Sequence, residues 1–388
     1  MFYSNSFADL MKLLDQKILN SAIKTNNSDK GSQKLNTKTH LMAVIFAQIT
    51  NPHGLREMEL QLDHMQKIMC KYGMNKVKKS TLSDANRNRD SKVFADIAKG
   101  LINKSKAIYG DLIDCVSLLD SSTITIKGRG TGWTEDTRIR TGQGLKLHVE
   151  YLSCEDIINS IKIGPTNIND VTAATDLKIQ EGWTYVYDKG YNDYNWWYRI
   201  HTQGAFFVTR IKKNAKIKVT GERKVDKKSN PYIISDSYVL FSNKNPRGGK
   251  INQLADTTLR LIVAINPEDN KEYSFITNNL SESSSVKATY YKTRWQIELL
   301  FKWLKQILKI KKFLCQNENG IKSQIYAAII TYILIGIYKR LSGEGASRTL
   351  DILSKIKIHL FYGAHQSTSG YYRKKPNDIR NANLCLDL

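Results

Sequence analysis

Residues 290–305, YYKTRWQIELLFKWLK, hold the pattern from which the rest of the chain can be interpreted. On a helix with about 100° per residue, five of the polar side chains in this segment fall within a stripe about 80° wide. They are Tyr291, Arg294, Glu298, Lys302 and Lys305. Branched aliphatic residues, among them Ile297, Leu300 and Leu304, fall on the other side. The spacing therefore predicts an amphipathic helix, part of a longer helix over 285–314.

The polar stripe is unusual because it places one carboxylate among three basic side chains, with Trp295 at its edge. The basic groups could neutralise DNA phosphates along roughly 20 Å of helix. Glu298 lies in the middle, where it could hold a divalent cation beside a phosphate. The same residues also fit a solvated surface with Arg294–Glu298 and Glu298–Lys302 ion pairs. Helical geometry alone leaves both interpretations open.

Two aspartates follow short apolar segments, Asp120 in VSLLD and Asp188 in TYVYD. Acidic groups at strand ends in an α/β sheet commonly lie at the functional edge. Either residue alone also fits a turn cap. Together with Glu298 they form an all-oxygen set, which Mg²⁺ prefers, and two such ions about 4 Å apart can drive phosphodiester attack. We therefore expect Asp120, Asp188 and Glu298 to be catalytic and to bind metal.

The charge of the chain indicates a polyanionic partner. Its 388 residues include 59 Lys and Arg against 36 Asp and Glu, a net charge of +23. Residues 205–250 carry twelve basic residues against three acids, and residues 286–313 carry eight against one. This clustering favours salt-dependent binding to nucleic acid, although a basic protein with no such partner stays possible on composition alone. The five cysteines form no CxxC pair, which argues against a zinc ribbon and for reduced thiols in the cytoplasm.

The texture of the sequence changes along the chain. Residues 1–109 show helical spacing, and a helix over 82–102 opens with Arg87 and Arg89, which could enter a DNA groove or form a solvated face. From residue 110 short strands alternate with helices, and residues 213–280 are rich in short β-branched runs. The apolar run at 325–338 is too short for a membrane span and predicts a buried helix.

These features together resemble the DDE transposases of bacterial cut-and-paste insertion sequences, in the group with the signature Y-x2-R-x3-E-x6-K. Tyr291, Arg294, Glu298 and Lys305 match that signature without a change in spacing. LLDSSTI around Asp120 and YDKGYNDY around Asp188 are similar to the two aspartate blocks of the family. The segments FFVTRIKKN (206–214) and KSTLSDANRNRD (79–90) are also similar to family segments. One departure is the pair Asn169-Asp170, where related sequences have His-Asp.

The resemblance implies an α/β (α+β) fold, a ribonuclease-H-like mixed sheet flanked by helices. In that fold the first aspartate lies on the first strand, the second at the end of the fourth, and the glutamate on a later helix. The implied domains are a helical N-terminal DNA-binding domain over 1–109, a catalytic core over 110–212 and 281–345, a β-rich insertion over 213–280, and a C-terminal helix and tail over 346–388.

The resemblance also implies an activity and its partners. The family cleaves DNA at transposon ends and transfers the strand to a target, using Mg²⁺ or Mn²⁺, with two ions expected here. Its partners would be the terminal inverted repeats, the target DNA and a second copy of the chain on the paired ends, with no membrane. The place of action would be the bacterial cytoplasm, on the nucleoid. The alternatives are a ribonuclease-H-like endonuclease without transposition and a domesticated DNA-binding protein.

By the same analogy, several residues would contact DNA. Tyr291, Arg294, Lys302 and Lys305 would lie near the cleaved phosphate, and the ring of Trp295 could stack on a displaced base. Further phosphate contacts are expected from basic residues elsewhere in the chain: Lys189, Arg210, Lys212, Lys213, Arg87 and Arg89.

Overall fold

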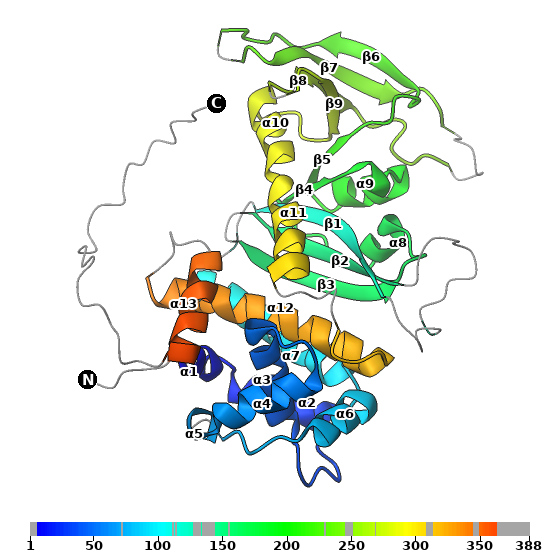
Figure 1. Ribbon diagram of the computed structural model, residues 1–388. Helices are drawn as coiled ribbons and strands as arrows, with labels where there is room; N and C mark the ends of the chain where they lie inside the picture. Colours follow the sequence, from blue (N-terminus) through cyan, green and yellow to red (C-terminus); the bar gives the residue numbers. More distant parts are fainter. Residues whose placement is uncertain are drawn as a thin grey trace.

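The structure is a computed structural model of the chain. It describes residues 6–70, 73–110, 112, 115–126, 133, 144–153, 156–228, 230–244, 251–267, 269–307, 313–343 and 349–362. The tail expected after the last helix lies outside these residues. Figure 1 shows one sheet that runs through the molecule, with the N-terminal helices at one end and the strands of residues 213–280 at the other.

Among the described residues, nine strands form a single mixed sheet in the order β3-β2-β1-β4-β5-β9-β8-β7-β6. They are β1 (Val116–Thr125), β2 (Gly144–Leu152), β3 (Ile157–Pro165), β4 (Thr184–Tyr187), β5 (Phe206–Arg210), β6 (Ile217–Glu222), β7 (Ile233–Phe241), β8 (Leu259–Ile265) and β9 (Glu272–Thr277). β1, β2 and β3 form an antiparallel meander, while β4 and β5 run parallel to β1. This arrangement confirms the predicted mixed sheet flanked by helices.

The strands of residues 213–280 continue that sheet. β9 pairs antiparallel with β5 through Val208↔Thr277, and β8, β7 and β6 follow in turn. The backbone groups along the outer edge of β5 are thus satisfied by a strand that lies more than sixty residues further along the chain. The sheet therefore joins the two aspartate strands to the segment that precedes the helix of the signature.

The helices lie at one end of the sheet and on its two faces. They are α1 (Ser6–Lys12), α2 (Gln16–Asn26), α3 (Thr37–Thr50), α4 (Leu55–His64), α5 (Gln66–Met69), α6 (Lys79–Asn88), α7 (Lys92–Tyr109), α8 (Asp170–Ala174), α9 (Tyr194–Thr202), α10 (Ser284–Thr293), α11 (Trp295–Lys302), α12 (Glu318–Leu341) and α13 (Thr349–Tyr362), with two short turns, η3 (Lys189–Tyr191) and η4 (Trp303–Ile307). α9 packs on β5 on one side, and α10 and α11 cross β4, β5 and β1.

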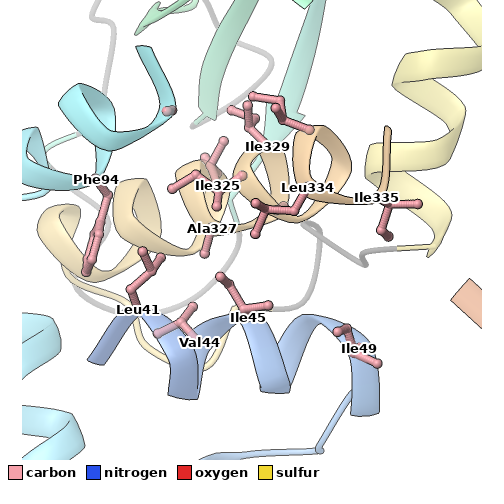
Figure 2. Close-up of a cluster of buried hydrophobic side chains, with 14 of the residues drawn as sticks. Leu41, Val44, Ile45, Ile49, Phe94, Ile325, Ala327, Ile329, Leu334 and Ile335 are labelled. Carbon is pink, nitrogen blue, oxygen red and sulfur yellow. The ribbon is translucent and has the colours of Figure 1, made fainter. Parts of the chain in front are cut away.

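The apolar run at 325–338 forms the middle of α12, which is buried along most of its length. Figure 2 shows Ile325 and Leu334 of this helix packed against Leu41 and Ile45 of α3. By length and hydropathy α12 is the one helix among the described residues that could cross a membrane, but 78% of its most apolar window is buried in the protein. The helix is apolar all round because protein surrounds it.

The N-terminal helices share a core with the sheet. One continuous cluster of buried side chains includes residues of α1, α3 and α7, of α11 and α12, and of β1, β2, β4 and β5. The opposite face of the sheet is covered by aromatic residues, with Trp197 of α9 against Phe207 of β5 at a ring distance of 5.1 Å. The N-terminal helices are therefore held by the same packing that supports the signature helix.

A buried ion pair ties the outer strands to the start of α10. Asp236 on β7 and Arg260 on β8 are 2% and 1% exposed, and Arg260 Nη2 lies 2.5 Å from Asp236 Oδ2. Arg260 also donates to the carbonyl of Glu282, and the Glu282 carboxylate pairs with the buried Lys287 of α10. Because buried charges are stable only when paired, these contacts fix where the helix begins.

We expect Asp236→Asn to lower the free energy of unfolding by roughly 3–5 kcal/mol, because it leaves the Arg260 guanidinium buried without a counterion. The double variant Asp236→Leu/Arg260→Met should recover most of that loss. Urea unfolding measures both. The exposed pair Lys244–Asp256 of the same segment is the control, and Asp256→Asn should change little. Equal losses in Asp236→Asn and Asp256→Asn would contradict this account.

Candidate active site

The register of β1 and β4 places the two aspartates side by side. The parallel ladder pairs Leu119 with Tyr187, and Asp120 and Asp188 are the next residues along each strand. Adjacent strands lie about 4.8 Å apart, so the two backbones remain neighbours at this point. Asp188 directly follows β4 and caps the turn η3, where its Oδ1 accepts a hydrogen bond from the Gly190 N–H at 2.7 Å. The two predicted aspartates are therefore brought together.

β1 does not end at Asp120, as the sequence predicted. It continues to Thr125 because β2 pairs with it as far as Thr125↔Gly144. Only the pairing with β4 stops before the aspartate, since β4 is short. Asp120 thus lies where the strand loses one neighbour, which leaves its carboxylate room on that side.

The predicted single helix over 285–314 is divided. α10 ends at Thr293, α11 begins at Trp295, and a π-helical turn, η4, follows from Trp303 to Ile307. Arg294 keeps helical dihedrals at the junction, so Arg294 and Glu298 still share one side of the helix, whereas Lys302 is exposed. Residues 308–312 lie outside the described residues.

Arg294 connects the helix to the first aspartate. Its Nη1 lies 3.4 Å from Asp120 Oδ2, and its Nη2 lies 2.5 Å from Glu298 Oε1. About two turns after Glu298, Lys305 donates to the hydroxyl of Ser122, which lies on the same face of β1 as Asp120. Two signature cations thus hold the helix against β1, and Glu298 is brought to Asp120 through a shared guanidinium.

The Asp120 carboxyl is strongly perturbed. Burial raises the pKa of Asp120 to about 6, the Ser121 N–H and Arg294 oppose the rise, and Asp188 and Glu298 add to it. Carboxylates gathered in this way repel one another, and a divalent cation relieves that repulsion. The oxygen-only chemistry of the set fits a hard cation. In the described part of the chain, however, no three Asp, Glu, His or Cys side chains are arranged closely enough to hold an ion.

Tyr291 packs between two guanidinium groups. Arg294 and Arg210 each lie 5.6 Å from the centre of its ring, and Arg210 also lies 5.3 Å from the ring of Tyr273. Burial raises the pKa of Tyr291, and the neighbouring Arg294 and Arg210 oppose that rise. Arg210, at the end of β5, is therefore part of the wall of the site, held by cation–π contacts.

The other predicted DNA contacts differ in exposure. Trp295 is 61% exposed on α11, unusual for an indole, and Lys302 follows on the same helix with its side chain exposed. Lys212, Lys213 and Arg87 are also exposed, and Lys189 is half-buried in η3. These side chains are placed where a duplex could reach them.

Arg89 is not. Its guanidinium is buried, donates to the Leu35 carbonyl at 2.6 Å and lies 3.0 Å from His40 Nδ1. Burial lowers the pKa of His40 to about 3, so a neutral ring faces the guanidinium. The expected helix over 82–102 is broken between α6 and α7, and Arg89 lies in that break, turned into the bundle. Its predicted contact with DNA is therefore corrected to a structural role.

Sequence patterns assigned no role to a fourth carboxylate, Asp170 at the start of α8. Its Oδ1 lies 2.9 Å from Lys146 Nζ and 3.4 Å from His148 Nδ1. Burial alone would raise the pKa of Asp170, but His148, Ser121 and Lys146 together hold it well below its usual range. The only sequence signal was the pair Asn169-Asp170, which the resemblance had marked as a departure.

Comparisons with known proteins show the family of the chain. Residues 111–334, more than half of the chain, match the family model described as the transposase DDE domain. The chain belongs to the DDE transposases. Residues 3–75 match a domain of unknown function.

Two curated relatives of this transposase come from bacterial sources. One is y4zB of Sinorhizobium fredii, described as a candidate transposase, which is 36% identical over 67% of this chain and 71% of its own. The other, from a Synechocystis strain, is described as a candidate transposase for the insertion sequence element IS4SA. It is 29% identical over 72% of this chain and 77% of its own.

Among solved structures, a piggyBac transposase synaptic complex with hairpin DNA covers 92% of this chain and 80% of that chain, at 11% identity and a TM-score of 0.49. The family membership makes the protein a DNA transposase of the insertion-sequence type, an enzyme that binds and cleaves DNA and depends on a divalent metal.

We expect Asp120→Asn to stabilise the transposase in EDTA at neutral pH. A carboxyl whose pKa is raised by folding destabilises the native state once it is ionised. The gain should therefore be absent below about pH 4, grow between pH 4 and 6, and reach up to about 3 kcal/mol above pH 6. Urea unfolding across this range measures it, and the exposed Asp84→Asn should show no such pH dependence. Loss of stability above pH 6 in Asp120→Asn would contradict the assignment.

Proposed function

We propose that Asp120, Asp188 and Glu298 are the three catalytic carboxylates of this transposase. The observation that carries the proposal is the Arg294 guanidinium, which contacts Asp120 and Glu298 at once, while the β1–β4 register holds Asp188 beside Asp120. The three acids are far apart in the chain, and these contacts, which relate Asp188 and Glu298 each to Asp120, support a shared site. Each supplies only oxygen ligands, as the chemistry of phosphodiester attack requires.

We infer that these carboxylates hold Mg²⁺ or Mn²⁺, with two ions as the working number. When bound, such ions activate an attacking hydroxyl and stabilise the leaving oxygen. The residues of the chain supply the rest. Asp120 must be ionised to act as a ligand, and Arg294 keeps Glu298 on the same side of the sheet as Asp120. Arg294 also provides positive charge where a scissile phosphate would approach.

The exposed surface of α11 is the proposed contact for the transposon end. Trp295 offers an aromatic face on which an unpaired base can stack, and Lys302 lies two turns further along. Lys212 and Lys213 follow β5 directly, so backbone contacts can extend toward the outer strands. We propose that the ends are terminal inverted repeats, that two copies of the chain act together on paired ends, and that the work takes place on the bacterial nucleoid.

Asp188→Asn should abolish strand cleavage while leaving DNA binding within about twofold of the parent. The substitution keeps the shape of the side chain, and an asparagine oxygen can still accept the Gly190 N–H bond, so η3 is preserved. Cleavage of a duplex that carries the terminal repeat of the element, with a binding isotherm in parallel, measures both. Cleavage by Asp188→Asn at the rate of the parent would end the assignment.

A second prediction concerns the α11 surface. Lys302→Ala should weaken binding to the terminal duplex and reduce the slope of log affinity against log salt by about one, as expected for one lost phosphate contact. Lys162→Ala is the control, because Lys162 pairs with Asp176 at 2.7 Å on the far strand β3. If both variants keep the slope of the parent, Lys302 does not contact a phosphate.

A further inference from the structure

The turn after Asp188 lies between two carboxylates. A Cβ placed at Gly190 would lie 2.9 Å from Asp188 Oδ1 and 3.0 Å from Asp170 Oδ2. Real Cβ atoms essentially never show a contact of 2.9 Å, so a side chain at position 190 would displace the Asp188 oxygen and crowd the Asp170 oxygen. Asp170 is the first residue of α8, a helix that packs on the turn η3 containing Gly190. The Asp170 carboxylate therefore lies beside the turn that follows Asp188, with room for glycine but not for a larger residue.

Asp170 is itself held from the other side by β2. Lys146 and His148 alternate along this strand, so both side chains point to the same face, toward α8. Lys146 Nζ lies 2.9 Å from Asp170 Oδ1 and also donates to the carbonyl of Ile168, at 3.3 Å. The two charged side chains are 17% and 20% exposed, so the pair is shielded from much of the solvent. These two contacts of Lys146 and the partial burial of both side chains restrict the positions that Lys146 and Asp170 can adopt.

The sheet places this pair on the face of β1 opposite Asp120. His148 is directly across from Ser121 in the β1–β2 ladder, whereas Asp120 faces Arg294 of the signature helix. Asp170 cannot approach Asp120 without crossing the strand. Its negative charge instead lies next to Asp188, and like charges repel. This repulsion disfavours orientations of the Asp188 side chain that point its carboxylate toward α8, and favours those that point it toward Asp120.

We propose that Asp170 and Lys146 form a positioning pair that orients the carboxylate of Asp188, acting through the Gly190 turn. The proposal rests on Asp188 being a catalytic carboxylate, as argued above. Asp170 contacts neither substrate nor reacting atoms in this role. It sets the direction in which Asp188 presents its oxygens, and so the concentration of divalent metal that the reaction needs.

The test compares the Mg²⁺ dependence of cleavage in full-length variants. Asp170→Asn and Lys146→Met should raise the Mg²⁺ concentration for half-maximal cleavage of a terminal-repeat duplex about tenfold, with the rate at saturating Mg²⁺ within about threefold of the parent. The double variant should resemble each single variant, because the two side chains act as one unit. Gly190→Ala should shift the Mg²⁺ requirement in the same direction, since its methyl group displaces Asp188 Oδ1.

Asp176→Asn is the matched control, because it removes an exposed carboxylate from a Lys pair just beyond α8. Asp176→Asn should keep the Mg²⁺ dependence of the parent. Lys146→Arg, which keeps the positive charge, should need a Mg²⁺ concentration close to that of the parent, unlike Lys146→Met. A purely structural role for Asp170 would lower the unfolding midpoint and the active fraction without moving the Mg²⁺ requirement, and that result overturns the proposal. So does complete loss of cleavage at every Mg²⁺ concentration, which would make Asp170 a ligand.

The outcomes separate this inference from the proposed function. Full activity of Asp188→Asn would remove the catalytic assignment itself. An inactive Asp188→Asn combined with an unchanged Mg²⁺ requirement in Asp170→Asn would leave the catalytic assignment standing and refute only the positioning pair.

Discussion

The parallel pairing of β1 with β4 is the constraint on which the site depends. It ends one residue before each aspartate, so two carboxylates that lie 68 positions apart in the chain become neighbours. The other elements of the site pack against the two strands near this point. Arg294 and Lys305 attach the signature helix to β1, and α8 packs on the turn that follows β4. A shift of one residue by either strand in this register would turn the aspartate of that strand to the opposite face of the sheet, away from the other aspartate.

The outer strands give the signature helix a second anchor. A helix that carries Tyr291, Arg294 and Glu298 must keep its position to within a fraction of a side chain for its cations and its carboxylate to meet β1. The Asp236–Arg260 pair and the Glu282–Lys287 contact fix its first turn, while Arg294 and Lys305 fix its last turns. The segment between the second aspartate and the glutamate therefore contributes to the geometry of the site as well as to the surface.

Local patterns in the sequence were enough to predict strands alternating with helices, the amphipathic stripe and the buried nature of α12, whereas the mixed sheet was predicted from the resemblance. The patterns also singled out Asp120, Asp188 and Glu298, of which the structure makes Asp120 and Asp188 neighbours and links Asp120 to Glu298 through Arg294. The rest depends on contacts between distant segments. Nothing near Arg89 in the sequence shows that it turns toward His40 and Leu35, and β9 joins β5 only in three dimensions. The importance of Asp170 likewise becomes visible only when Gly190 lies beside it.

The continuous core that joins the N-terminal helices to α12 and the sheet has a mechanical consequence. Modules on flexible linkers can swivel to accommodate DNA of variable length, but a shared core does not allow that movement. Any base pairs bound by the N-terminal helices must lie at a fixed distance from the nucleotide that is cut, and at a fixed rotation about the axis of the duplex. Five extra base pairs, about half a turn of the duplex, would carry the gripped groove to the opposite side. The rigid shared core would therefore fix the spacing, along the end of the mobile element, between the bound base pairs and the nucleotide that is cut.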